Sequence, residues 1–257
     1  MNILLLIWLG LLGLIVGSFL NATAGRWGTS RQNARRSKCF DCGSELQAKN
    51  LIPLVSWLMN KGRCAYCYSR VSARYPLVEL LTAMLFIIAG IIAGSTIQLG
   101  FIIVLFSMLI IIALIDYDQF IIPHEFSVSL ALLSFATLFI STFDLSTLQP
   151  DMWQVLAGPL LALFFWAIWA ITRGRGMGFA DGTLALSIGW LLGLWHGITA
   201  VFLSFWIGTI ITVGIMLWQK HHNKTDALAM KSAVPFGPFL IVGFLIVYIS
   251  NWSLFVF

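Results

Sequence analysis

The chain has 257 residues, of which 60% are hydrophobic and only 10% are charged, and its mean hydropathy is +0.94. Soluble domains carry about 25% charged residues, so this composition excludes a water-soluble globular protein. The apolar runs are about 20 residues long, which predicts membrane-spanning helices rather than the shorter, alternating strands of a barrel. The net charge of +5 is explained by topology and by attraction to anionic lipid, so we expect no nucleic-acid partner.

Eight apolar runs predict an all-α, polytopic membrane helix bundle. They lie near residues 3–24, 76–94, 98–115, 126–143, 153–172, 183–196, 198–218 and 236–257. The sixth and seventh are nearly continuous across the stretch "LWHG". The first lacks a small-residue cleavage site, so we interpret it as a permanent helix rather than a signal peptide. We expect three parts: a first helix (1–24), a cytoplasmic loop domain (25–74) and a helix bundle (75–257).

The basic residues orient this bundle in the membrane. Of the fifteen Lys and Arg residues, ten lie between Arg26 and Arg74, two follow the fifth run and three follow the seventh. With eight spans these segments share one side, and the opposite loops carry acidic but no basic residues. The positive-inside rule therefore predicts cytoplasmic basic loops, with both termini outside.

All four cysteines lie in the predicted loop domain. "CFDCGSEL" contains Cys39 and Cys42, and "GRCAYCYSR" contains Cys64 and Cys67. Two C-x2-C pairs at this separation are typical of a structural zinc site with four thiolate ligands. Disulfides are disfavoured on the reducing cytoplasmic side, and a metal would help to stabilise a loop that is too small to hold a good core alone. Four cysteine ligands leave no open position for water, so we expect this zinc to be structural.

Three acidic residues lie at the predicted membrane edge. Asp116 and Asp118 end the third apolar run, and Asp181 precedes the sixth, after a glycine-rich turn. Acids in this position are functional candidates, and two facing carboxylates can share a proton and activate water against an amide. We interpret Asp118 as a solvated helix-end residue. From spacing alone, a protease using Asp116 and Asp181 and a proton- or cation-coupled transporter remain equal alternatives.

Several motifs, in order along the chain, resemble those of the bacterial type IV prepilin peptidases, also called prepilin leader peptidase/N-methyltransferases. They are "GSFLN", "LIPLVSWL", "GRCAYC", "SARYPLVELLTA", "LIDYDQFIIP", "GFAD" and "PFGPFL". Together they cover nearly the whole chain. Four positions depart from the family pattern: Ala180 stands where glycine is usual, Thr183 where lysine is common, His124 where Asp or Asn is common, and "CFDC" lacks the proline often seen after the first cysteine.

The resemblance implies a membrane aspartic endopeptidase of the cytoplasmic (inner) membrane. Its catalytic pair would be Asp116 and Asp181, and its four cysteines would form the family's tetracysteine zinc motif. The implied reaction removes the basic leader from type IV prepilins or type II secretion pseudopilins on the cytoplasmic face. The new N-terminus is then methylated with S-adenosylmethionine as donor, for which no binding residues are assigned. An inactive assembly factor for a pilus or secretion system is the remaining alternative.

Overall fold

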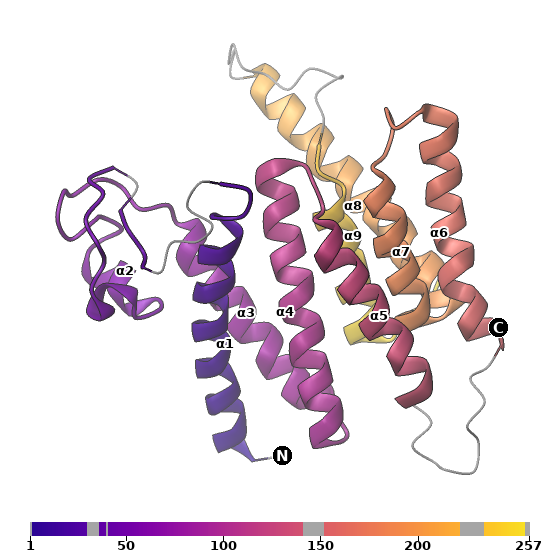
Figure 1. The fold of residues 1–257 in the computed structure, drawn as a ribbon, viewed down its shortest axis with the longest axis horizontal. Helices are drawn as coiled ribbons and strands as arrows, with labels where there is room; N and C mark the ends of the chain where they lie inside the picture. The colour runs from indigo at the N-terminus through magenta and orange to yellow at the C-terminus, as the bar shows by residue number, and fades with distance from the viewer. Residues whose placement is uncertain (1, 30–35, 40, 141–151, 222–233, 255–257) are drawn as a thin grey trace. The chain divides into compact units, whose positions relative to one another are not determined.

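A computed structural model describes residues 2–29, 36–39, 41–140, 152–221 and 234–254. Within these ranges all regular elements are helices, and the only β-type contacts are two isolated bridges, Lys38–Glu45 and Arg63–Arg70. The chain divides into two compact units, Met1–Leu114 and Ile115–Phe257. Figure 1 shows the helices of both units as ribbons. The predicted all-α class is confirmed.

Within the first unit, the helices α1 (Ile3–Ala24) and α3 (Arg74–Ile92) pack side by side (Figure 1). Small residues allow their backbones to approach closely. A Cβ added at Gly13 would lie 2.6 Å from the Ala83 Cα, and one added at Gly17 would lie 2.7 Å from the Thr82 Oγ1. Glycine at these two positions therefore sets the separation of α1 and α3.

The segment between α1 and α3 contains the cysteine pairs, a 3-10 turn η1 (Ala48–Leu51) and a short helix α2 (Val55–Met59). One buried side chain of α3 holds this segment. The Leu54 N–H donates to the Glu79 Oε2 at 2.8 Å, and Glu79 is 6% exposed. This bond ties the loop to the helix pair at a fixed point.

The helix α4 (Thr96–Gln119) ends in the second unit, which also contains α5 (His124–Ile140), α6 (Met152–Thr172), α7 (Phe179–Leu192), α8 (Leu194–His221) and α9 (Gly237–Ser250). The short helix α7 contacts α5, α6, α8 and α9. Its fit against α6 depends on another glycine, because a Cβ at Gly189 would lie 2.6 Å from Gly158 Cα and Ala157 O. Buried α7 is therefore the centre of the unit.

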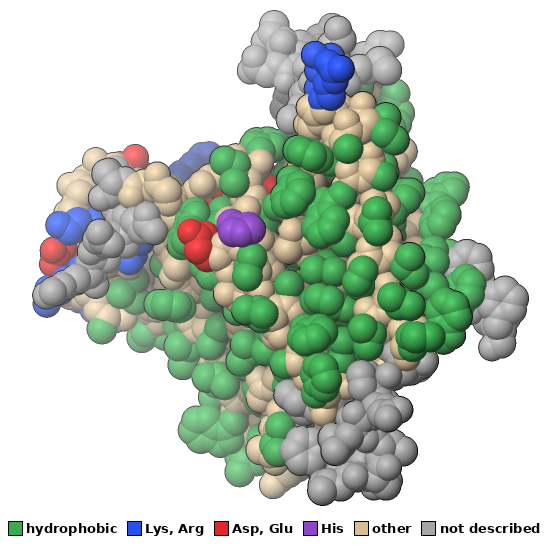
Figure 2. Space-filling model, turned by 45° about the vertical axis from the view of Figure 1, so that its right-hand side comes forward, with side chains coloured by type: hydrophobic (Ala, Val, Ile, Leu, Met, Phe, Trp, Pro, Cys, Tyr) green, Lys and Arg blue, Asp and Glu red, His purple; other side chains and the backbone are tan. Residues whose placement is uncertain are grey.

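The surface of the helices is apolar. Among the described residues, five helices are long and apolar enough to cross a membrane, namely α1, α3, α4, α6 and α8, and α5, α7 and α9 are shorter apolar helices. Large side chains such as Ile171 (82% exposed) and Leu132 (66% exposed) face outward, and Figure 2 shows hydrophobic side chains over most of the face in view. Such a surface would not be soluble in water, and it fits a lipid environment. The chain is a multi-pass membrane protein.

The eight predicted runs correspond to eight of these helices, and two boundaries differ in a way that affects the site. The third run was predicted to end at residue 115, but α4 continues to Gln119 and ends where Phe120 takes a positive φ of 58°. The sixth was predicted to begin at residue 183, but α7 begins at Phe179. The two acids therefore lie within helices rather than beyond their ends. The predicted basic loop around Lys224 and the acidic loop around Asp144 lie outside the described residues.

Candidate functional site

Asp116 lies in the last turns of α4, and its side chain is directed to another helix. It is 5% exposed, and its Oδ2 accepts a hydrogen bond from the Gly237 N–H at 3.0 Å. Gly237 is the first residue of α9 and is buried. The carboxylate thus meets one of the backbone donors that the start of a helix leaves without an intrahelical partner. The helix dipole also favours negative charge at this end.

Asp181 is placed in the same way at the start of α7. It lies in the first turn, it is 7% exposed, and its Oδ2 accepts the Gly178 N–H at 2.9 Å. The helix start is held by α6, because Trp166 Nε1 donates to the Phe179 carbonyl at 3.2 Å and its ring stacks on that of Phe179. A Cβ at Gly182 would collide with the Trp166 ring. Packing on both sides of Asp181 therefore fixes its backbone.

The second unit brings these two acids together although 65 positions separate them in the sequence. The charge of Asp116 acts on Asp181, so the carboxyl groups lie within range of direct electrostatic interaction. Each carboxylate accepts a hydrogen bond from a backbone N–H, and each residue is buried. A pair of buried, interacting carboxylates is suited to share a proton and to act as acid and base.

Three residues near the two acids bear on the sequence interpretation. Asp118 is exposed, as expected of a solvated residue near the helix end. Ala180, which replaces the family's usual glycine, lies inside α7 and is not among the described residues with positive φ. The methyl group of this alanine therefore causes no left-handed strain. Thr183 is buried in the next turn.

The four cysteines lie in two knuckles with matching backbone geometry. In the first, Gly43 N–H donates to the Cys39 carbonyl (3.2 Å) and Cys39 N–H to the Ser44 carbonyl (3.0 Å). In the second, Tyr68 N–H donates to the Cys64 carbonyl (3.1 Å), and Cys64 N–H bonds Ser69 in the same way (2.8 Å). The fifth residue of each knuckle has a positive φ, 70° at Gly43 and 59° at Tyr68. The second knuckle thus adopts this turn without a glycine.

The cysteine cluster fits a tetrahedral metal ion. All four are free thiols, and their Sγ atoms lie within 4.8 Å of one another. Four sulfurs at about 2.3 Å from one zinc lie about 3.8 Å apart, and the Cys39 and Cys67 Sγ atoms are separated by 3.8 Å. The Cys42 N–H lowers the pKa of Cys39 to about 6, and the Ser69 hydroxyl lowers that of Cys67. Both effects favour the thiolate, which is the metal-binding form.

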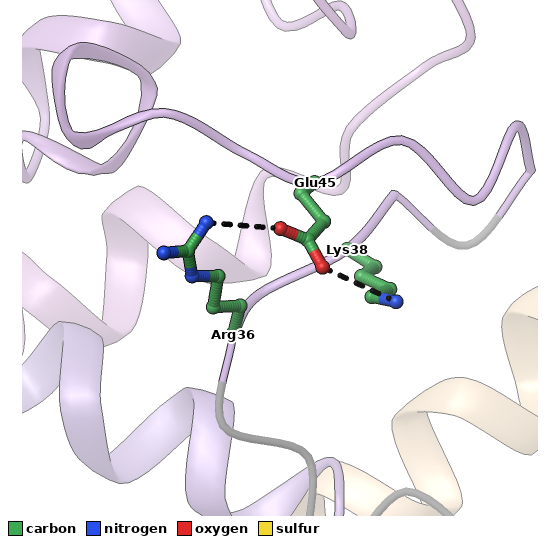
Figure 3. Close-up of polar contacts among 3 residues, drawn as sticks. All are labelled: Arg36, Lys38 and Glu45. Carbon is green, nitrogen blue, oxygen red and sulfur yellow. Dashed lines mark hydrogen bonds and ion pairs between the residues drawn. The ribbon is translucent and has the colours of Figure 1, made fainter.

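Two exposed ion pairs link the residues on either side of the first knuckle. Figure 3 shows Glu45 between Arg36 (3.1 Å) and Lys38 (3.4 Å). These two cations lower the pKa of Glu45, which is exposed. Exposed pairs contribute little to stability, so the geometry of the knuckle depends mainly on its backbone hydrogen bonds.

Comparisons with known proteins place both sites in one family. Residues 11–93 match the bacterial peptidase A24 N-terminal domain, and residues 103–213 match the type IV leader peptidase family. The chain is 32% identical over 243 residues to the prepilin leader peptidase/N-methyltransferase of Bacillus subtilis, covering 94% of this chain and 93% of that protein. The chain belongs to the type IV leader peptidase family.

Other members of the family are similarly close. The prepilin leader peptidase/N-methyltransferase of Aeromonas salmonicida is 34% identical over 213 residues, covering 80% of this chain and 68% of that protein. That of Pectobacterium carotovorum is 30% identical over 259 residues, covering 91% and 89%. No solved structure matches. The match to the leader peptidase family contains Asp116 and Asp181, and the N-terminal match contains the four cysteines.

Two site residues were not recognised as such from the sequence. Gly178 and Gly237 donate their backbone N–H groups to the two carboxylates. The motifs "GFAD" and "PFGPFL" mark these regions, but a backbone donor has no side-chain signature. Their role becomes visible only when the partner of each carboxylate is known.

Proposed function

We propose that the chain is a membrane aspartic endopeptidase in which Asp116 and Asp181 form the catalytic pair. The observation that supports this pair is the convergence of two buried carboxylates from α4 and α7, each held by a backbone N–H at a helix start. Membership of the leader peptidase family and the names of the relatives favour a peptidase over a transporter. A paired acid and base also favours an active enzyme over an inactive assembly factor.

The chemistry of such a pair is amide hydrolysis. One ionised carboxylate removes a proton from water, and the resulting hydroxide attacks the scissile carbonyl carbon. The other, protonated carboxyl group donates its proton to the carbonyl oxygen. As the C–N bond breaks, the first carboxyl group gives the proton it took from water to the leaving nitrogen, and the second recovers its proton from a hydroxyl of the tetrahedral intermediate. The products are a new carboxylate and a new amine. The N–H bonds from Gly178 and Gly237 would orient the carboxylates without supplying a proton.

The proposed substrate is the prepilin or pseudopilin of a type IV pilus or type II secretion system. The basic loops predict that the leader is cut on the cytoplasmic face of the inner membrane. The names of the relatives also imply N-methylation of the new terminus. S-adenosylmethionine would then be the methyl donor, and the transfer would leave S-adenosylhomocysteine.

The four cysteines, Cys39, Cys42, Cys64 and Cys67, would hold one zinc ion. Because four thiolates complete the tetrahedral shell, the metal supplies structural cross-linking rather than catalysis. It would replace the apolar core that a loop of this size lacks. We assign it the role of shaping the loop domain beside α1 and α3.

Cleavage of a purified prepilin in detergent or membranes, followed by mass spectrometry, tests the catalytic pair. Asp116→Asn and Asp181→Asn keep the shape of the side chain but cannot exchange a proton. Each should lower turnover by roughly 10²- to 10⁴-fold, as expected for the loss of a general acid or base. Asp118→Asn, on the same helix but exposed, is the matched control and should cleave normally. Wild-type cleavage by either of the first two variants would refute the pair.

The same spectra report the modification. A cleaved product that is heavier by one methyl group only when S-adenosylmethionine is present would support the transferase activity. A cleaved product that stays unmodified at saturating donor would restrict the chain to the peptidase. Neither outcome affects the assignment of the two aspartates.

A further inference from the structure

A side chain at Gly237 would overlap the carboxylate of Asp116. A Cβ at this position would lie 2.5 Å from the Asp116 Oδ2, 3.2 Å from its Cγ and 3.4 Å from the Ile122 Cδ1. Gly237 is not among the described glycines with positive φ. Space, rather than backbone conformation, is therefore the reason for glycine here.

The short distance follows from the hydrogen bond itself. The Gly237 N–H reaches the Asp116 Oδ2 at 3.0 Å, and this approach brings the Cα of the glycine against the carboxylate. An aspartate side chain has only two torsions, so its carboxylate cannot move aside and keep the same donor. At the other acid the fit is looser, because a Cβ at Gly178 would lie 3.2 Å from the Asp181 Oδ2 and 3.9 Å from its Cγ.

The packing of Phe236, next to Gly237, leaves the start of α9 little freedom to move. Phe236, which precedes the glycine, packs against Phe205 and Phe165, with ring centroids 4.9 and 6.1 Å away. Phe165 is fully buried. The start of α9 is therefore fixed by packing on α6 and α8, and an added methyl group would displace the carboxylate rather than the helix.

We propose that Gly237 is a positioning residue for catalysis: its N–H orients the Asp116 carboxylate, and its missing side chain leaves the space that the carboxylate occupies. This inference rests on the proposed function of Asp116. It assigns a catalytic reason to the glycine of "PFGPFL", which lies 121 positions from the aspartate. Displacement of a catalytic group by about 1 Å can lower turnover about 10²-fold.

The test compares three alanine variants in detergent, with the folded fraction measured for each. Gly237→Ala should lower kcat for prepilin cleavage about 100-fold and leave KM within about threefold. Gly214→Ala is the neutral control, because nothing lies within 4 Å of an added Cβ on that part of α8. Gly243→Ala, on α9, would contact Ser204 and Ala200 instead, so it reports the effect of disturbed α8–α9 packing without a change at Asp116.

A variant at Ile122 distinguishes the clash with the Asp116 carboxylate from the contact with the isoleucine side chain. Ile122→Val removes the Cδ1 methyl group that the new Cβ would approach, so it relieves packing but not the clash with Asp116. The double variant Gly237→Ala with Ile122→Val should fold and should still turn over about 100-fold more slowly than the protein with Ile122→Val alone. Recovery of turnover in the double variant would overturn the positioning role.

The remaining outcomes also decide the question. A normal kcat for folded Gly237→Ala, a change in KM alone, or failure of both Gly237 variants to fold would reduce the glycine to a packing residue. The proposed function fails separately, if Asp116→Asn cleaves normally. Inactive Asp116→Asn together with fully active Gly237→Ala would overturn the positioning role alone.

Discussion

The contact between Glu79 and the loop predicts how firmly the loop domain is attached to α3. Leu54 has φ 59° and ψ −51°, and the Val55 N–H donates to the Pro53 carbonyl at 2.6 Å. These values describe a classic γ-turn, which is rare and strained. The buried Glu79 carboxylate accepts the Leu54 N–H at 2.8 Å, and we expect this bond to hold the turn in place.

The free-energy cost of the strained turn and the stabilisation from the hydrogen bond are similar in size. A strained backbone conformation costs of order 1–3 kcal/mol, and a hydrogen bond to a charged group contributes about 1.5–3 kcal/mol. Glu79→Leu removes the acceptor and puts an apolar side chain in its place in the α1–α3 interface. We expect the loop to lose about 2 kcal/mol of local stability, which corresponds to a roughly 30-fold rise in its opening equilibrium.

Hydrogen exchange of the peptide that contains Leu54 and Val55 measures this opening. Glu79→Leu should exchange these amides roughly 30-fold faster than the wild type. Glu79→Gln keeps an oxygen acceptor without the charge, so its effect should be several-fold smaller. Zinc content should not change in either variant, because the cysteine knuckles have their own bonds. Wild-type exchange in Glu79→Leu would refute the reasoning and leave the γ-turn without an explanation.

Two further predictions concern the metal and the topology. The protein purified under reducing, chelator-free conditions should contain one zinc per chain, and Cys64→Ser combined with Cys67→Ser should remove it and expose the loop to protease. Because protons compete with the metal for thiolates, zinc should be lost as the pH falls and retained as it rises; metal-free wild-type protein would disprove the site. A reporter that is active only outside the cytoplasm should be active when fused at Gln149 and silent when fused at Asn33. Both fusion sites lie outside the described residues. The reverse pattern would overturn the orientation and place the aspartates on the wrong face for the substrate.

The sequence was sufficient for features that depend on local composition. Apolar runs of membrane length predicted each of the long helices, because a chain in lipid must satisfy its backbone donors and acceptors internally. The two C-x2-C knuckles were equally predictable, since short-range spacing alone brings each cysteine pair to one turn. The approach of the two knuckles to within 4.8 Å was the expected consequence of a shared metal.

Helix ends near the acids were predicted less well. The apolar run stops at Ile115, and the two aspartates that follow suggested a helix end there, but α4 continues for another turn to Gln119. Hydropathy reports where a chain prefers lipid, whereas a helix ends where a backbone conformation interrupts it. In α4 that interruption is the positive φ of Phe120.

The surroundings of the candidate catalytic pair were decided by tertiary structure alone. The sequence, through its family motifs, singled out Asp116 and Asp181 but did not identify the backbone N–H groups that bind them. Gly237 reaches Asp116 from 121 positions away, and it can do so only because α9 is packed against α8. A backbone N–H is the same in every residue except proline, so its partner depends on which helices meet and in which register. That register is set by small residues such as Gly189 and Gly243, whose fit exists only once the helices are packed together.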